Sequence, residues 1–426
     1  MSRKGTLSRL TRSWLAATVV AIFFPLVLVE IGPEAQAQTF QVLHSFTGGG
    51  DGGTPLAGLT VAAGGTFYGT ASGSEGSGPG VVFKLTSGGS GWALTPLNRT
   101  LPSDAAGGAG QFVIGPSGAL FGTTSVGGRG DCLGHEVGCG QVYEVQPPAR
   151  ACASVLCSWT ATALYDFNDA PDAGVPTSPV IFDRAGNMYG TTQYGGTGCY
   201  DYGCGTVYKL TPSGSGWTES VIYSFQSGSD GERPDGGLIS DSSGNLYGTT
   251  EFGGSPGCGT IFELSPSGSG WRETILHTFN CGDGSSPGGS LIADHFGNLY
   301  GVALAGGGDN GGAIFELSDP GNWFFRVLYS FPEYSAPAGT LVFDRSLNLY
   351  GAAGGGAYGL GMVYKLALTD GTWTATDLYD FTGGSDGWGS YGGLVFDSAG
   401  NLYGTAAYGG IGTCNLGCGT IWEITP

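Results

Sequence analysis

The sequence predicts an all-β fold, a seven-bladed β-propeller of four-stranded antiparallel blades. A phrase related to "NLYG" occurs seven times, and each copy belongs to a unit with four short runs rich in β-branched and aromatic residues. Outside the N-terminal segment, no run of ten or more residues shows helical periodicity. The phrase recurs at spacings of about 50 to 70 residues, typical of propeller blades. Its aromatic residues are Tyr68, Phe121, Tyr189, Tyr247, Tyr300, Tyr350 and Tyr403.

Composition supports many short strands joined by glycine-rich turns. The chain has 426 residues, of which 85 are glycine, and 12% are aromatic. The absence of a strict Gly-X-Y period excludes collagen. A hydrophobic content of 40% is sufficient to form a core, which argues against disorder.

The first 37 residues resemble an export signal. Basic residues in the first twelve positions precede an apolar run at 15–29, and "AQA" at 35–37 fits the small-residue cleavage rule. The apolar run is shorter than the ~20 residues of a usual membrane span, which favours cleavage over permanent anchoring. We therefore expect a signal peptide at 1–37, one propeller domain at 39–426, and a secreted or periplasmic protein without a transmembrane anchor.

The mature chain is strongly acidic. Removal of four basic and two acidic residues gives a charge of (15 − 4) − (34 − 2) = −21. Nucleic acid and anionic membranes bind basic patches, so this charge argues against both as partners.

The fourth unit illustrates the strands of a blade. Its four runs are 236–241, 245–250, 259–265 and 271–279. The mature chain opens with "TFQVLHSF", which matches the fourth run, and closes with "GTIWEIT", which matches the third. A ring can use the first strand to complete the last blade, whereas a solenoid gains nothing from this offset. We therefore predict that 40–46 pairs antiparallel with 420–425.

Asp-Gly turns link the first and second strands of several units. They contain Asp183, Asp241, Asp294 and Asp397. Asp accepts hydrogen bonds from nearby backbone and Gly supplies positive φ, so we interpret them as hairpin turns. One carboxylate per turn is a poor calcium cage, although calcium remains an alternative. Recurring tryptophans at strand starts are expected to pack between blades. They are Trp92, Trp217, Trp271, Trp323 and Trp373.

The repeated phrase "GGLI.D..GNLYGTT..GG....GT[VI][YF].L.PSGSGW" resembles the exported bacterial tandem repeat labelled GloVer (Gloeo/Verruco). The resemblance covers nearly all of the mature chain, and it implies no assigned biochemical role. The first two strands also resemble NHL-type propeller repeats. Units one and two depart from the pattern, because "AAGGTFYG" and "GPSGALFG" lack its Asp and Asn. These departures weaken a common ligand role for the turn.

Ten cysteines in an exported chain predict disulfides. Three pairs lie within loops between second and third strands, and Cys258 faces Cys281 across a predicted hairpin. The fifth pair lies in the long turn of unit two. Zinc is the alternative, but no histidines stand nearby as ligands. The expected pairs are Cys132–Cys139, Cys152–Cys157, Cys199–Cys204, Cys258–Cys281 and Cys414–Cys418.

Candidate binding residues lie on the face that carries the inter-blade connections and the variable loops between second and third strands, here called the loop face. Acidic groups beside exposed aromatics suit a carbohydrate or a cationic ligand. The alternative is that Asp-Gly forms turns and the aromatics cover the blade ends. The acidic candidates are Asp51, Asp230, Asp283 and Asp386, and the aromatic candidates are Tyr194, Phe252 and Tyr408.

Signals for catalysis are few. His44 and His277 occupy strand positions where sister units have tyrosine, and His295 lies in a turn, so His135 is the one functional candidate among four histidines. No catalytic triad, metal-ligand spacing or phosphate loop is present, and we expect no catalytic residue, metal or cofactor.

The leading hypothesis is an exported binding or surface interaction module, whose ligand is a glycan or an envelope protein. The alternatives are a carbohydrate-active hydrolase or lyase that uses acidic residues of the loop face, and a structural envelope protein without a ligand.

Overall fold

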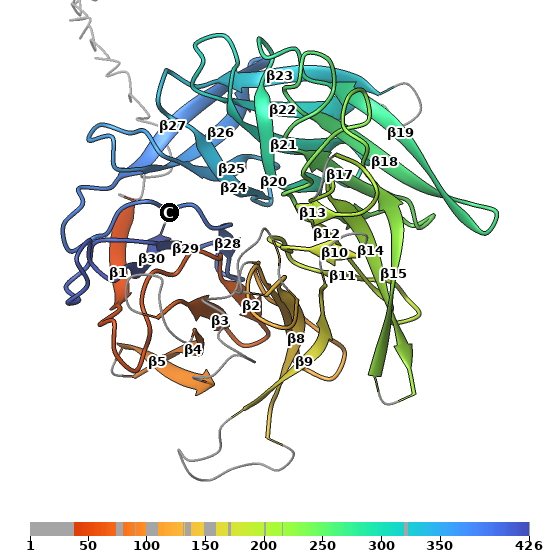
Figure 1. Ribbon diagram of the computed structural model, residues 1–426. Coiled ribbons are helices and arrows are strands. Elements are labelled where there is room, and N and C mark those ends of the chain that lie inside the picture. Colours follow the sequence, from red (N-terminus) through yellow and green to blue (C-terminus); the bar gives the residue numbers. More distant parts are fainter. Residues whose placement is uncertain are drawn as a thin grey trace, which may run out of the picture. The chain divides into compact units, whose positions relative to one another are not determined.

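Seven four-stranded antiparallel sheets form a ring in the computed structural model, which contains no helix among its described residues (Figure 1). The first strands of the blades lie nearest the centre and the fourth strands at the periphery. The predicted seven-bladed propeller is therefore confirmed. The described residues are 38–73, 80–89, 91–98, 110–130, 132, 138–148, 159–168, 172–199, 202–214, 216–318 and 323–425.

The first four blades follow the predicted strand order. Blade 1 contains β2 (Thr60–Ala62), β3 (Thr66–Ala71), β4 (Val81–Gly88) and β5 (Gly91–Asn98). Blade 2 contains β6 (Val113–Ile114), β7 (Leu120–Thr124), β8 (Gln141–Gln146) and β9 (Thr160–Asp166). Blade 3 contains β11 (Ile181–Phe182), β12 (Met188–Thr192), β14 (Thr206–Ser213) and β15 (Gly216–Ser224). Blade 4 contains β16 (Ile239–Ser240), β17 (Leu246–Thr250), β18 (Thr260–Ser267) and β19 (Gly270–Thr278).

The remaining blades and one small ladder complete the ring. Blade 5 contains β20 (Ser285–Ala293), β21 (Leu299–Ala305), β22 (Ala313–Ser318) and β23 (Phe324–Ser330). Blade 6 contains β24 (Pro337–Phe343), β25 (Leu349–Ala353), β26 (Met362–Thr369) and β27 (Thr372–Asp380). Blade 7 contains β28 (Val395–Phe396), β29 (Leu402–Ala406), β30 (Thr420–Thr425) and β1 (Thr39–Ser45). A two-stranded ladder joins β10 (Ala173–Gly174) to β13 (Tyr194–Gly195) on the loop face.

The N-terminal strand closes the ring as predicted. β1 pairs antiparallel with β30, with Phe40 opposite Ile424. The Phe40 ring stacks on Tyr379 of blade 6 with centroids 3.6 Å apart and also contacts Trp422. The closing strand is thus held by a hydrogen-bonded ladder and by aromatic packing on the preceding blade.

Neighbouring blades are joined near the axis by threonine hydrogen bonds. Thr123, Thr191 and Thr405 donate to backbone carbonyls of the next blade at 2.9, 3.0 and 3.3 Å. The inner connections approach so closely that glycine is required: a Cβ on Gly58 would lie 2.8 Å from the backbone nitrogen of Gly393. These contacts fix the width of the space at the centre of the ring.

Disulfides and tryptophans occupy their predicted places. Four predicted disulfides are present: Cys132–Cys139, Cys199–Cys204, Cys258–Cys281 and Cys414–Cys418. The candidate His135 and the pair Cys152–Cys157 lie outside the described residues. Trp271 and Trp323 pack against Tyr189 and Tyr247 of the preceding blades. Among the described residues, no helix is long and apolar enough to span a membrane.

Candidate functional site: the mouth of the central cavity

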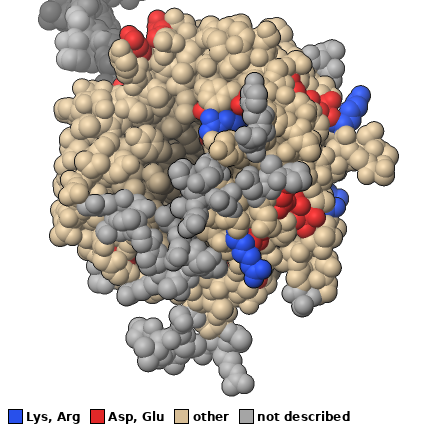
Figure 2. Space-filling model, viewed as in Figure 1, with Lys and Arg blue, Asp and Glu red and all other residues tan. Residues whose placement is uncertain are grey.

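A cavity of about 300 Å³ lies where the inner connections of the blades converge. Its lining includes residues from all seven blades, and Figure 2 shows a hollow near the centre, beside which acidic and basic side chains lie together. Much of the wall is glycine, so backbone groups and a few side chains define its chemistry. This cavity is the candidate site.

The connections that lead into the first strands share a strained turn. Five of them carry a residue with positive φ directly before a proline, a conformation that costs on the order of 1–3 kcal/mol for a residue other than glycine. Its N–H donates to the start of a third strand, as Arg233 does to the Cys204 carbonyl at 2.7 Å. The strained residues are Thr54, Val175, Arg233, Ser286 and Ala336, with φ of 49°, 60°, 56°, 50° and 40°.

The residue after each of these prolines lines the cavity, and it differs from blade to blade. The lining positions are Leu56, Thr177, Asp235, Gly288 and Ala338, and Tyr391 follows Ser390 at the equivalent position of blade 7. The mouth is therefore asymmetric. Blades 7 and 1 supply apolar and aromatic side chains, whereas blades 3 and 4 supply a hydroxyl and a carboxylate.

The polar side of the mouth is held by hydrogen bonds. Asp235 Oδ1 accepts from Thr177 Oγ1 at 2.8 Å and from Gln193 Nε2 at 2.6 Å. Both bonds go to the same oxygen, and no hydrogen bond to Oδ2 is found among the described residues. The carboxylate is thus positioned by the protein and retains acceptor capacity on Oδ2.

Two predicted aromatic residues meet at an arginine beside this carboxylate. Arg233 Nη2 donates to the Tyr194 hydroxyl at 2.7 Å. The guanidinium lies 5.1 Å from the Tyr194 ring centroid and 5.4 Å from that of Phe252, at cation–π distance. Burial raises the pKa of Glu251, although Arg233 opposes this shift. Arg233 was not predicted from the sequence. The feature that could have indicated it is a charged residue directly before the loop proline.

The third predicted aromatic residue belongs to the apolar side. Tyr408 stacks on Trp388 with centroids 4.4 Å apart, and the two residues exchange backbone hydrogen bonds. Tyr391 and Leu56, exposed at 44% and 47%, stand beside them at the mouth. Tyr408 therefore lies close to the cavity, although it does not line it.

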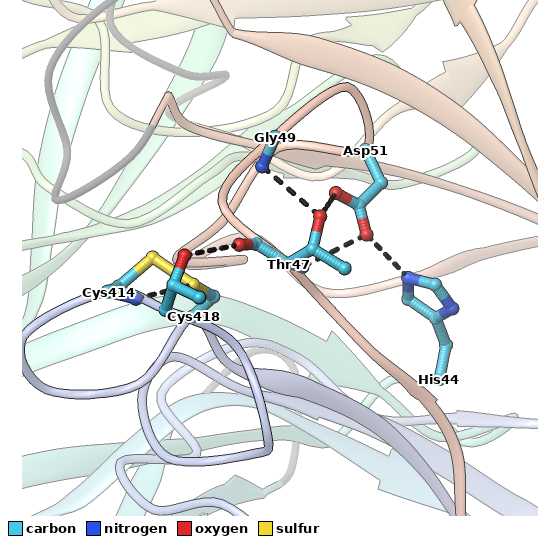
Figure 3. Close-up of polar contacts among 7 residues, drawn as sticks. His44, Thr47, Gly49, Asp51, Cys414 and Cys418 are labelled. Atoms are coloured by element: carbon cyan, nitrogen blue, oxygen red, sulfur yellow. Dashed lines mark hydrogen bonds and ion pairs between the residues drawn. A yellow bond between two sulfur atoms is a disulfide. The ribbon is translucent and has the colours of Figure 1, made fainter.

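The four acidic candidates do not line the cavity; they hold their own loops. Asp51 Oδ2 accepts from the Thr47 N–H at 3.0 Å and from His44 Nε2 at 3.1 Å, as Figure 3 shows. The Thr47 hydroxyl donates to Oδ1. Burial opposes ionisation, but these hydrogen bonds hold the pKa of Asp51 below its usual value.

The other acidic candidates repeat this arrangement. Asp230 accepts from Tyr223 at 2.6 Å, Asp386 from Tyr379 at 3.0 Å, and Asp283 Oδ2 lies 3.2 Å from His277 Nε2. Asp172, which sequence reasoning missed, accepts from Tyr165 at 3.1 Å. The signal was a spacing of six or seven residues from a strand Tyr or His to each Asp.

The Asp-Gly turns on the opposite face form the predicted hairpins. Asp241 Oδ1 accepts from the backbone of Ser243 and Asn245 at 2.8 and 2.9 Å, and Oδ2 accepts from the Asn245 side chain. Protein donors therefore engage both oxygens, as the hairpin interpretation requires.

The fold and its axial cavity define a repeat-built β-propeller protein. A family model described as the Gloeobacter/Verrucomicrobia repeat matches residues 132–353. The chain belongs to this family. Comparison with the curated proteins found no match.

Solved structures share the fold at low sequence identity. A structure described as the extracellular domain of a hybrid two-component system from B. thetaiotaomicron is 13% identical with a TM-score of 0.53, covering 91% of this chain and 42% of that one. A polysaccharide lyase, an ulvan lyase bound to a GlcA–Rha3S saccharide, is 10% identical with a TM-score of 0.51, covering 90% and 95%. At these identities the likeness shows the fold alone.

Proposed function

We propose that this protein is an exported binding module that holds a saccharide at the mouth of its central cavity. The observation that carries the proposal is the asymmetric ring of residues that follow the loop prolines. Sugars present hydroxyls and apolar C–H faces, so they suit a site with fixed polar groups on one side and exposed aromatic and aliphatic groups on the other. Tyr391 and Leu56 supply the apolar and aromatic contacts on one side of the mouth. Asp235 and Thr177 supply the polar contacts on the other side.

Export is part of the proposal. The described disulfides are typical of oxidising compartments outside the cytoplasm. Together with the signal-like segment at 1–37, they support a secreted or periplasmic location. Fractionation of cells that express the full-length chain, with detection of the processed protein, tests this location.

Binding is tested with the protein purified after export, first on a glycan array and then by titration calorimetry. We expect at least one saccharide to bind, and Tyr391→Ala or Asp235→Asn to weaken it about tenfold, the effect of losing roughly 1–1.5 kcal/mol of stacking or hydrogen bonding. Tyr334→Ala is the matched control, because this tyrosine is 83% exposed and does not line the cavity. An array without any bound saccharide would overturn the proposal.

A carbohydrate-active enzyme is the second candidate. Glu251 favours it, because burial raises the pKa of this carboxyl against the opposing effect of Arg233, and the charge of Asp235 adds to the rise. Paired carboxyl groups with unequal pKa values are the usual requirement for glycosidic chemistry. The test is the release of products from a panel of polysaccharides. If products are released and Glu251→Gln or Asp235→Asn abolishes their release, the protein is an enzyme and not a binding module.

A further inference from the structure

A second cavity, of about 430 Å³, adjoins the mouth at blade 7. Leu56 lines both cavities, so the two share a wall. The lining residues of the second cavity are Thr54, Leu56, Tyr408, Cys414, Asn415, Leu416 and Gly417.

An aromatic surface continues from one cavity to the other. Tyr391 lines the first cavity and Tyr408 the second. Both rings contact Gly389, where an added Cβ would lie 2.9 Å from Tyr391 Cε2 and 3.2 Å from Tyr408 Cδ2. Trp388 stacks on the Tyr408 ring and fixes its orientation. The two tyrosine rings therefore lie close together, with one ring at each cavity.

The outer wall of the second cavity is an exposed but rigid leucine. Leu416 is 59% exposed, yet the Cys414–Cys418 disulfide spans it and its carbonyl accepts from Gly409 at 2.8 Å. A loop backbone held in this way loses little conformational freedom on binding, which favours affinity. The described lining carries no carboxylate and no basic group.

We propose that the second cavity binds the next unit of a saccharide chain held at the mouth, so that the ligand is a neutral oligosaccharide of two or more units. This inference rests on the proposed function. The aromatic and aliphatic walls suit stacking of sugar rings. A neutral chain is favoured because the lining offers no cation to a uronate or sulfate, and the charge of −21 beyond residue 37 repels acidic polymers.

Chain length is the variable that tests the subsite. The probe is an array of neutral gluco-, manno-, galacto- and chito-oligosaccharides of one to six units, with uronate oligosaccharides of the same lengths. We expect affinity to rise about tenfold between one and three neutral units and then to level off. Leu416→Ser should remove most of this gain and leave binding of a single unit unchanged. Ile411→Ser is the control, since Ile411 is 78% exposed in the same loop but does not line the cavity.

Each other outcome separates this inference from the proposed function. Affinity that does not depend on length overturns the subsite but leaves the mouth as a binding site. Binding restricted to uronates overturns the neutral class. If sedimentation shows a dimer that Leu416→Ser abolishes, the second cavity binds another copy of the chain, and the subsite is overturned. An array without any binding overturns the proposed function itself.

Discussion

Each glycine of the repeated "YG" dipeptide makes room for an aromatic ring of the neighbouring strand. Gly248 of β17 lies against the ring of Phe262 on β18, where a Cβ would be 2.6 Å from Cζ. The dipeptide is therefore a packing requirement of the blade core. The equivalent pairs are Gly69–Phe83, Gly122–Tyr143, Gly190–Tyr208, Gly301–Phe315, Gly351–Tyr364 and Gly404–Trp422.

Gly248→Ala should destabilise the protein by about 1–3 kcal/mol, the usual cost of an extra methyl group in a well-packed core. The Phe262 ring is fully buried in the blade core. The free energy of unfolding in urea measures the loss. Gly216→Ala is the control, because a Cβ there meets nothing within 4 Å. Equal stability of the two variants would show that the core relaxes around the methyl group.

The acidic residues of the loop face show where residue-level prediction ended. An Asp-Gly pair in a loop suits both a ligand site and a turn, and the sequence alone does not choose. The structure shows Asp230 bonded to Tyr223, a strand residue seven positions earlier. A register shift in the strand pair β14–β15, between Val207 and Tyr208, skips Ile222, so Tyr223 pairs with Val207 one residue out of the register of the preceding pairs. This bulge depends on the fold, so the partnership could not be derived from strand alternation.

The fourth strand of a blade contacts the loop that enters this blade from the preceding one. In blade 4 this contact places two carboxyl groups, those of Asp230 and Glu273, at one tyrosine hydroxyl. The Tyr223 hydroxyl lies 2.6 Å from Asp230 Oδ1 and 3.0 Å from Glu273 Oε2. A hydroxyl carries one proton, so two carboxyl partners are satisfied together only if one of them is protonated. In blade 5, Phe325 occupies the equivalent position and stacks on His277 instead. The carboxyl pair is therefore not repeated in every blade, although Glu219 and Asp172 form a second such pair in blade 3.

The Glu273 carboxyl should make stability fall as pH rises. Burial, followed by its hydrogen bond to Asp230, raises the pKa of Glu273 to about 8 from an ordinary 4.5. A raised pKa in the folded state contributes stability that is complete below pH 4.5 and is lost as pH rises through 8. Glu273→Gln should therefore gain stability relative to wild type between pH 5 and pH 8.

Urea unfolding at pH 5, 6, 7 and 8 measures this difference. Glu263→Gln on the adjacent strand β18 is the control, because its carboxylate accepts from Ser265 and, within the described part of the chain, no hydrogen bond joins it to another carboxyl group. A constant difference between wild type and Glu273→Gln over the whole range would mean that Glu273 is ionised throughout.

Prediction at the level of elements succeeded where a feature repeats and stopped where it varies. The seven copies determined the blade count, the strand phase and the ring closure, since repetition averages out local ambiguity. The cavity-lining position after each loop proline carries no repeated residue, so the repeat pattern does not mark it. At that position the copies disagree, as Leu56, Asp235 and Tyr391 do. The left-handed residues before the prolines are also not readable from residue type, since Val175 and Thr54 disfavour positive φ.

The ring as a whole is closed without a covalent bond, by β1 on β30. Among the described residues, the first strand is therefore a fourth strand and the last is a third strand of the same blade. Blades 1, 3, 4 and 6 join their third and fourth strands by a two-residue connection, as between Ser213 and Gly216 in blade 3. We therefore expect that the break in the chain between a third and a fourth strand can be moved to another blade without loss of the ring.

A circular permutant tests this equivalence. Thr425 is joined to Thr39, its partner in the ladder, by a Gly-Ser turn like that of blade 3, and new ends are opened between Ser213 and Gly216. The new chain again begins with a fourth strand and ends with a third, and exposed turns tolerate such cuts. We expect the same circular dichroism spectrum and a free energy of unfolding within about 1–2 kcal/mol of the parent, because every described strand pair is kept and the loop lengths hardly change.

A second permutant opened between Gly190 and Thr191, inside the buried strand β12, should fail to fold, since the cut interrupts a central ladder. If the first permutant also fails, the pairing of β1 with β30 is specific to blade 7, and the ring is not a set of interchangeable blades.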